Sequence, residues 1–274
     1  MKIQRIWAIY FSATGTTKTI TERIAGGAAR LLDAEYQTYD FTLPASREGF
    51  PELGEENLVV FGCPVYAGRV PNVLLPYLRT VRGNGALAVP VSLYGNRDFD
   101  DGLIELRDIL EAGGFRTIAG GAFIGEHSFS RILAAGRPDA QDLALADQFA
   151  RQIAEKAAAW NPVVHHDPAP VRGEEPIRPY YQPRDRKGNP IDIRKVKPKT
   201  SDACVNCGLC ARVCPMGSIN PEDVRTFRGI CIKCGACVKK CPVGAKYYDD
   251  PGYLYHKEEL ELGYARRAEP ELFV

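Results

Sequence analysis

The sequence contains two copies of one cysteine run, CVNCGLCARVCP at residues 204–215 and CIKCGACVKKCP at residues 231–242. Every cysteine of the second run lies 27 residues after its counterpart in the first, and the two runs hold eight of the nine cysteines. Gly208 and Gly235 occupy the same step of each run, where the backbone must pass close to whatever the thiolates hold. The proline after each fourth cysteine leads the chain away without needing an amide donor. The runs therefore predict a thiolate ligand set.

This spacing resembles that of the bacterial ferredoxins with two [4Fe–4S] clusters, and the resemblance covers residues 199–248. In that family the fourth cysteine of each run ligates the cluster of the other run. The resemblance implies a protein that moves single electrons. It also implies two ligand sets, one of Cys204, Cys207, Cys210 and Cys241, and one of Cys231, Cys234, Cys237 and Cys214.

Zinc and disulfides are the other uses of such cysteines. Zinc sites take four ligands as two separated pairs, whereas each run here offers three close cysteines and a fourth. A disulfide framework needs an oxidising compartment, and the chain begins with a strand-like segment instead of a secretory signal peptide. Zinc and disulfides therefore fit the cysteine pattern less well than iron–sulfur clusters do.

Length, composition and charge indicate the number of domains and exclude some classes of binding partner. The 274 residues leave room for two domains, and 45% hydrophobic content supports a sizeable core. A formal net charge of +1 argues against nucleic acid as a partner. No apolar run reaches membrane-spanning length, so we expect no membrane insertion. We expect a cytoplasmic protein, and oxygen-sensitive clusters add the expectation of an anaerobic or reducing cytoplasm.

Residues 1–160 alternate between strand and helix patterns. We expect strands at residues 3–10, 34–40, 58–62, 86–93 and 115–124, and helices at 16–32, 71–79, 101–112 and 139–160. This alternation predicts an α/β fold, a parallel sheet covered by helices on both faces. In such a sheet, ligands bind beyond the carboxyl ends of the strands.

The loop after the first strand, SATGTT at residues 12–17, opens the first helix. Hydroxyls and backbone N–H groups at a helix start favour a phosphate. A plain helix cap is the alternative, but four hydroxyls around one glycine exceed what a cap needs. No nucleotide-triphosphate or dinucleotide motif follows this strand, and Gly83-x-Gly85-x-x-Ala88 precedes a strand, so we interpret it as a turn.

Residues 11–17 look like the phosphate loop of flavodoxins, which hold the FMN phosphate with uncharged hydroxyls and amides. The segments 62–71 and 92–98 match the two flavodoxin loops that enclose the isoalloxazine ring. The resemblance spans residues 2–160 and implies a flavodoxin-like, doubly wound, five-stranded parallel sheet that binds FMN. The implied FMN-binding residues are Ser12, Ala13, Thr14, Gly15, Thr16, Thr17, Pro64, Val65, Tyr66, Ala67, Gly68, Tyr94, Gly95, Asn96, Arg97 and Asp98.

Within this set, the resemblance makes Tyr66 and Tyr94 neighbours of the flavin, and Gly68, Gly95 and Asn96 contacts of its edge. A stacked tyrosine excludes water and disfavours the charged, reduced flavin. The alternative for both tyrosines is a surface aromatic at a loop tip. The arginines at positions 69 and 97 either stabilise reduced flavin or are solvated charges at the rim.

Four other residues merit attention. His127 follows the fifth strand and is a weak catalytic candidate, since a free imidazole exchanges protons near neutrality; the alternative is a structural hydrogen bond. Cys63, the ninth cysteine, is predicted to be a small buried residue. His165 and His166 have no nearby ligand set, so we expect no metal there.

The composition changes after Trp160, and residues 161–198 carry eight prolines and many basic residues. The resulting division is a flavodoxin-like FMN-binding domain at 1–160, a proline-rich basic linker or strap at 161–198, a small α+β two-cluster ferredoxin-like domain at 199–250, and a C-terminal tail at 251–274. The whole chain resembles flavodoxin–ferredoxin fusion proteins.

The fusion implies an electron-transfer protein that passes single electrons between two [4Fe–4S] clusters and FMN, and on to redox partner proteins. Joining the modules raises the effective concentration of cluster near flavin. Basic side chains around the cysteine runs favour an acidic partner. The alternative is an FMN-dependent reductase of a small organic acceptor, fed by the ferredoxin domain. The carrier is favoured because no second substrate motif is visible and the three flavin loops are short.

Overall fold

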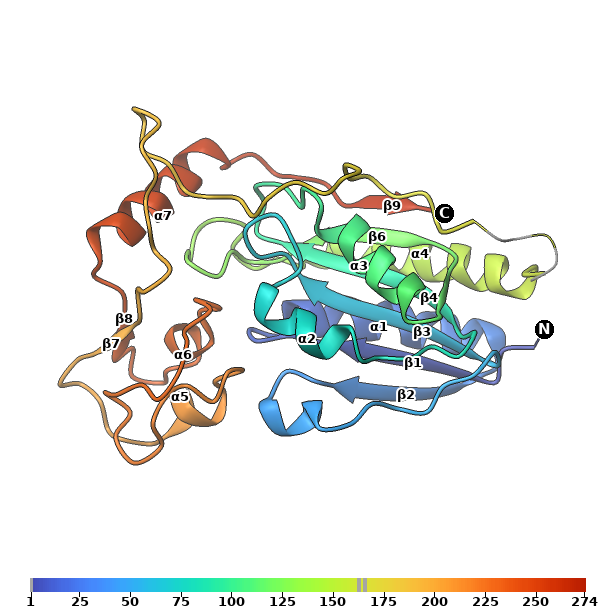
Figure 1. Ribbon diagram of the computed structural model, residues 1–274, viewed down its shortest axis with the longest axis horizontal. Helices are drawn as coiled ribbons and strands as arrows, with labels where there is room; N and C mark the ends of the chain where they lie inside the picture. Colours follow the sequence, from blue (N-terminus) through green and yellow to red (C-terminus); the bar gives the residue numbers. More distant parts are fainter. Residues whose placement is uncertain (1, 162–163, 165–166) are drawn as a thin grey trace.

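The structure, a computed structural model, describes residues 2–161, 164 and 167–274, and its larger part is one twisted sheet (Figure 1). Five parallel strands follow the order β2–β1–β3–β4–β6, and short β5 also pairs with β4. This is the flavodoxin-like order, in which the chain reverses direction across the sheet between β1 and β3. The fold class is therefore the one predicted. The strands are β1 (Arg5–Tyr10), β2 (Glu35–Asp40), β3 (Asn57–Pro64), β4 (Leu87–Tyr94), β5 (Arg116–Thr117) and β6 (Gly120–Ile124).

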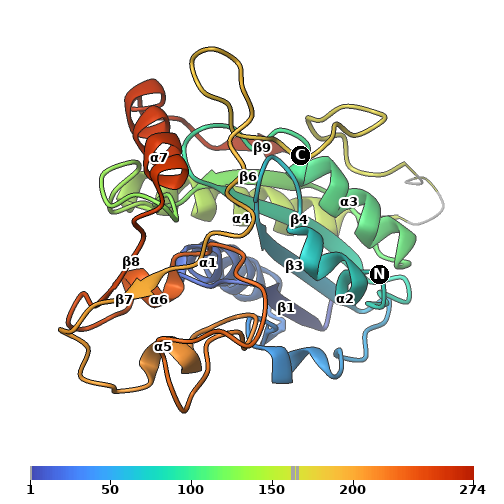
Figure 2. The same ribbon diagram turned by 60° about the vertical axis from the view of Figure 1, so that its left-hand side comes forward.

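Helices cover both faces of this sheet, as the buried central strands require (Figures 1 and 2). Helices α1 (Thr16–Leu32) and α4 (Ala140–Ala158) pack on one face, and α2 (Leu75–Leu78) and α3 (Gly102–Ala112) on the other. All of β4, and all of β3 except Pro64, is buried. Two short 3₁₀ helices, η1 (Pro44–Arg47) and η2 (Asn72–Leu74), complete the domain.

Two expected elements are shorter than predicted. The helix expected at 71–79 is a 3₁₀ turn followed by the single turn α2, where Pro76 lies in the first turn. A proline there lacks the amide that would continue a longer helix from upstream. The strand expected at 115–124 is divided into β5 and β6.

The C-terminal residues return to the sheet. Helix α7 (Pro251–Gly263) is followed by β9 (Glu271–Phe273), which pairs antiparallel with β6 and covers that edge of the sheet (Figure 1). The amide of Asn96 donates to the carbonyls of Tyr264 and Arg266, at 2.7 and 2.6 Å. The segment expected to be a tail is thus part of the N-terminal fold.

Residues 167–198, which we call the strap, run extended along the N-terminal domain to the cysteine module. The guanidinium of Arg178 pairs with the fully buried Asp101 at 2.6 Å. Nearer the module, the amide of Tyr181 donates to the carbonyl of Ala67 at 2.8 Å. The sequence predicted a linker or strap without a helix or strand, and within residues 167–198 the structure has neither. Its attachment to the domain was not apparent from composition.

Residues 199–250 form the cysteine module. Strands β7 (Lys199–Thr200) and β8 (Lys246–Tyr247) pair antiparallel, and each cysteine run contains one short helix, α5 (Leu209–Arg212) or α6 (Ala236–Lys239). The sequence repeat is also a backbone repeat, because positive φ angles recur 27 residues apart. The pairs are Asn206 and Lys233, Gly208 and Gly235, and Gly217 and Gly244. In the described part of the chain, no helix has the length and apolar character to cross a bilayer.

The buried guanidinium of Arg137 joins the C-terminal segment to α4. It forms an ion pair with Asp142, which is 0% exposed, and donates to the carbonyl of Ala268 at 2.6 Å. The change Arg137→Ala would leave the buried Asp142 carboxylate with only the more distant guanidinium of Arg267, at 3.6 Å. We expect the free energy of unfolding to fall by about 3–5 kcal/mol.

Urea unfolding followed by circular dichroism measures this loss. The control is Arg23→Ala, because the Arg23–Asp147 pair lies near the surface and such pairs contribute about 1 kcal/mol or less. Similar losses in the two variants would contradict the role given to Arg137.

Candidate functional site

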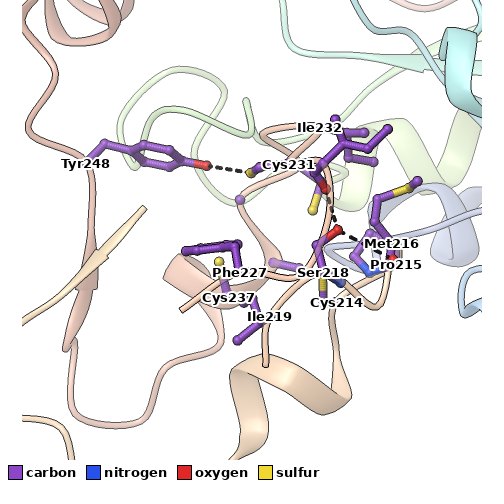
Figure 3. A pocket seen from close by; sticks show the side chains of 14 residues that line it. Cys214, Pro215, Met216, Ser218, Ile219, Phe227, Cys231, Ile232, Cys237 and Tyr248 are labelled. Carbon is purple, nitrogen blue, oxygen red and sulfur yellow. Dashed lines mark hydrogen bonds between the residues drawn. The ribbon is translucent and has the colours of Figure 1, made fainter. Parts of the chain in front are cut away.

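The eight cysteines of the two runs surround two separate cavities. Each cavity takes three cysteines from one run and the fourth from the other. Among the described residues, no three His, Cys, Asp or Glu side chains are arranged to hold a single metal ion. Cys204, Cys207, Cys210 and Cys241 line what we call the outer cavity, and Cys214, Cys231, Cys234 and Cys237 line the inner cavity (Figure 3).

The lining of these cavities suits an iron–sulfur cluster. Apolar side chains such as Ile219 and Phe227 surround the inner thiols, and Cys234 and Cys237 are each only 8% exposed. The amide of Ser218 donates to the sulfur of Cys214 at 3.3 Å. At the equivalent position of the other run, the amide of Ala245 donates to the sulfur of Cys241 at 3.2 Å. Such N–H groups stabilise negative charge on thiolate ligands.

The inner cavity faces the N-terminal domain and the outer cavity faces away from it. A Cβ atom added at Gly235 would meet the carbonyl oxygen of Ser128, in the loop after β6, at 2.4 Å. At the equivalent Gly208 the closest contact would be the flexible end of Arg212, at 3.1 Å. Cys207, in the outer set, is exposed. The sequence repeat therefore has two unlike environments.

Polar contacts and a shared apolar core hold the module against the domain. The ammonium of Lys239 lies 2.5 Å from Glu126 and donates to the carbonyl of His127 at 2.7 Å. Cys234 and Ala236 belong to the same apolar cluster as the buried Cys63, against which Tyr66 also packs. The sheet and the cysteine module thus share one interior.

The predicted phosphate loop lies at the start of α1. Gly15 is the residue before the helix and has a φ of 104°, which favours glycine. The Oγ of Ser12 accepts from the amide of Lys18 at 2.9 Å, so this hydroxyl acts as a cap. Within the described residues, the hydroxyls of Thr14 and Thr16 have no hydrogen bond. Both remain available to an anion at the helix N-terminus.

The other two flavin loops meet at a cavity of about 640 Å³. Tyr66 and Arg69 close a tight turn through hydrogen bonds of 2.8 and 3.2 Å, with positive φ at Ala67 and Gly68. We call the space the flavin-loop cavity, although residues 12–17 do not line it. From the predicted FMN set its walls include Val65, Tyr66, Ala67, Gly68, Tyr94, Gly95, Arg97 and Asp98.

Two predicted roles need correction. The side chain of Asn96 is 2% exposed and holds the C-terminal segment, as described above, and its Oδ1 also accepts from the amide of Ala268. The side-chain amide of Asn96 is therefore not free to contact a flavin edge. The guanidinium of Arg69 pairs with Glu105 and lies 4.4 Å from the ring of Tyr180, so it is not a solvated charge.

His127 also differs from expectation. Burial, followed by the nearby charge of Lys239, lowers the pKa of His127 to about 3. Its Nδ1 accepts from the amide of Phe129 at 3.1 Å, which leaves the proton on Nε2. The imidazole is therefore neutral at physiological pH and does not exchange a proton near neutrality.

Cys63 is buried, as predicted, and burial raises the pKa of its thiol. The predictions for His165 and His166 lie outside the described residues.

Sequence reasoning missed the other walls of the flavin-loop cavity. The strap contributes Tyr180–Pro183 and Ile191–Arg194, helix α7 contributes His256 and Leu260, and the cysteine module contributes residues 230–233. The only signal was a pair of adjacent tyrosines between prolines at 179–183. Neither segment has a motif or an apolar period.

These features can be compared with known proteins. Residues 203–246 match the family of the 4Fe-4S dicluster domain. A search of curated proteins finds no match to the chain. The chain thus joins a flavodoxin-like fold, defined by its strand order, to a segment that matches the 4Fe-4S dicluster domain.

Solved structures similar to the chain include flavodoxins. One, from the domain Archaea, shares 17% identity over 57% of this chain and 99% of its own, with a TM-score of 0.42. A Streptococcus flavodoxin has 17% identity over 57% and 98% of the two chains, with a TM-score of 0.37. Oxidised flavodoxin 1 from Bacillus cereus has 16% identity over 56% and 98%, with a TM-score of 0.39.

Cysteine variants test whether the runs exchange their fourth ligand. If they do, Cys210→Ala and Cys241→Ala change one and the same cluster, while Cys214→Ala and Cys237→Ala change the other. Loss of one cluster lowers iron from about eight to about four per chain. Anaerobic iron analysis and electron paramagnetic resonance of the reduced protein measure both effects. Cys214→Ala giving the spectrum of Cys210→Ala would contradict the exchange.

Threonine variants test the phosphate loop. Thr14→Val and Thr16→Val each remove a hydroxyl with no partner in the described chain, and we expect FMN binding to weaken by about 1–3 kcal/mol for each. Fluorescence titration of the flavin-free protein gives the affinity, and iron content should not change. The control is Thr19→Val, because the Thr19 hydroxyl already donates to the carbonyl of Gly15 at 3.1 Å. Equal affinity in all three variants and the parent would place the flavin elsewhere.

Proposed function

We propose that this protein transfers single electrons between two [4Fe–4S] clusters and FMN, and exchanges them with redox partner proteins. One observation carries the proposal: the inner cysteine cavity and the flavin-loop cavity share part of their walls. Ile230, Cys231 and Ile232 line both. A thiolate ligand of the inner set is therefore also a wall residue of the site that the flavin loops form.

The residues fit both cofactors. The free hydroxyls of Thr14 and Thr16 lie at the start of α1, where the helix dipole favours a phosphate. Tyr66 and Tyr94 line the cavity between the other two loops. When bound, FMN exchanges one or two electrons and each cluster exchanges one.

The protein's own side chains set the environment for this exchange. Tyr66 packs against the apolar cluster that contains Cys234, which excludes water between the two cavities. The ammonium groups of Lys233 and Lys239 lie in the same region and partly compensate the negative charge of thiolate ligands. The polar contacts of Lys239 to the loop after β6 also fix the module in position.

The two cavities have different environments, which suggests at which end of the cysteine module electrons are exchanged with a partner and at which end with the flavin. The outer cavity, with exposed Cys207, is where a partner protein would exchange electrons, and the inner cavity lies next to the flavin loops. Exposed basic residues near the cysteine runs, such as Arg212 and Lys240, favour an acidic partner. Thiolate-bound clusters fit a reducing cytoplasm, and their sensitivity to oxygen fits an anaerobic cell.

A second candidate is a flavin-dependent reductase of a small organic acceptor, with the clusters as its electron source. The observation that favours it is the covering of the flavin-loop cavity by the strap and α7. The cavity of about 640 Å³, which includes the space assigned to the flavin ring, lies within the range of small-molecule sites, about 300–1,000 Å³. A carrier that reacts only with proteins needs no such walls.

The double variant Cys204→Ala, Cys231→Ala tests the electron path, because each cavity loses one thiol. We expect reduction of FMN by a reduced low-potential ferredoxin to slow at least about tenfold, since each cluster requires four ligands. Stopped-flow absorbance of the flavin under anaerobic conditions measures the rate.

The control is direct reduction by dithionite, which should remain at the parental rate because the flavin loops are unchanged. FMN content should also stay near one per chain. Flavin reduction by the ferredoxin at the parental rate would show that the clusters do not supply the flavin.

A further inference from the structure

The flavin-loop cavity extends beyond the flavin loops themselves. Its far wall is formed by Tyr181 of the strap, His256 and Leu260 of α7, and Phe129 of the loop after β6. Both ribbon views show the strap and α7 side by side above the cysteine module (Figures 1 and 2), and the ring of Tyr181 stacks 6.0 Å from that of His256. These segments are not among the three loops expected to hold FMN. We call this part the strap pocket.

Polar groups in the strap pocket lack protein partners. His256 is 7% exposed, and no hydrogen bond to its ring occurs within the described chain. His127, on the same wall, uses Nδ1 to accept from Phe129, so its Nε2–H is also unpaired among the described residues. Neither ring has a buried nitrogen without a partner, so the unpaired nitrogens are open to water or to a ligand. Because both imidazoles line one cavity, they can donate hydrogen bonds to a ligand with accepting atoms.

Charge on this wall favours an anion. Burial, and after it the nearby guanidinium of Arg97, lowers the pKa of His256. The acidic residues of the lining are already paired, Asp98 with Arg172 at 2.9 Å and Asp192 with Arg194 at 2.8 Å. The ammonium of Lys233 donates to two backbone carbonyls and forms no ion pair with a carboxylate in the part of the chain described.

The shape of the walls favours a flat molecule. The rings of Tyr181, His256 and Phe129 form a continuous aromatic surface, since Phe129 lies 6.2 Å from His256 in an edge-on arrangement. The guanidinium of Arg97 lies 4.6 Å from the ring of Tyr181 and pairs with Asp100. Aromatic faces bind planar unsaturated groups through stacking and edge contacts.

We propose that the strap pocket binds a small planar organic carboxylate, an aromatic or conjugated acid, with His256 and His127 donating hydrogen bonds to its oxygens. This inference rests on the second candidate function, the flavin-dependent reductase, and names the class of small molecule that would meet the flavin. Binding alone is proposed, and the two histidines act as neutral donors. The strap and α7 are then parts of a substrate site as well as connections between modules.

Calorimetric titration with cinnamate tests this, using the full chain loaded with FMN and clusters under anaerobic conditions. We expect cinnamate to bind, and its neutral amide, cinnamamide, to bind at least about tenfold more weakly because the anion is lost. His256→Phe keeps a flat ring but removes the donor, and should weaken cinnamate at least about tenfold. His256→Gln keeps an N–H donor and should recover part of the affinity.

The matched control is Tyr255→Phe, also on α7, because the Tyr255 hydroxyl contacts the amide of Arg186 instead of the pocket. This variant should bind cinnamate like the parent. Circular dichroism of each variant verifies the fold. No heat of binding, equal affinity for acid and amide, or parental affinity in His256→Phe would each overturn the proposal.

The same preparations separate this inference from the proposed function. FMN content, iron content and flavin reduction by ferredoxin are measured before each titration. Normal electron transfer without cinnamate binding would contradict the strap-pocket proposal and leave the proposed electron path intact. Cinnamate binding in a protein whose clusters do not reduce its flavin would contradict the proposed electron path and leave the strap-pocket proposal intact.

Discussion

The exchange of the fourth cysteine between the two runs is the constraint on which the rest of the molecule depends. Each cavity is complete only when residues from both runs are in place, so neither run can form its site alone. The 27-residue repeat would make the two sites equivalent, but docking on the N-terminal domain separates them. One lies against the loop after β6, and the other faces outward. The two cavities formed by the repeated runs thus differ, because one lies against the N-terminal domain and the other faces solvent.

The docking itself is fixed from both sides of the module. Upstream, the strap is attached to the domain through Arg178 and Asp101, and downstream β9 pairs with β6. The chain therefore leaves the domain and returns to it with the cysteine module between the two attachments. The flavin-loop cavity lies where these segments converge, which is why its walls come from parts of the sequence more than a hundred residues apart.

Local patterns allowed much of this to be predicted. Helix α1 follows from its helical apolar period and the glycine before it, and the cavity linings follow the cysteine spacing. What could not be predicted depends on contacts distant in sequence. Strand β9 has three residues, too few to show a period, and it exists because β6 offers an edge. The pKa of His127 depends on burial by the docked module, and an amide such as Asn96 has the same appearance whether it binds a cofactor or the backbone.

Strand β9 also protects the sheet from other chains. The residues of β6 are all buried, and without β9 their outer N–H and C=O groups would form an open, apolar edge. Such edges pair readily with strands of other molecules and start aggregation. Proteolytic removal of the last few residues would therefore affect solubility as well as the position of α7. Strand β9 therefore protects this edge of the sheet against self-association.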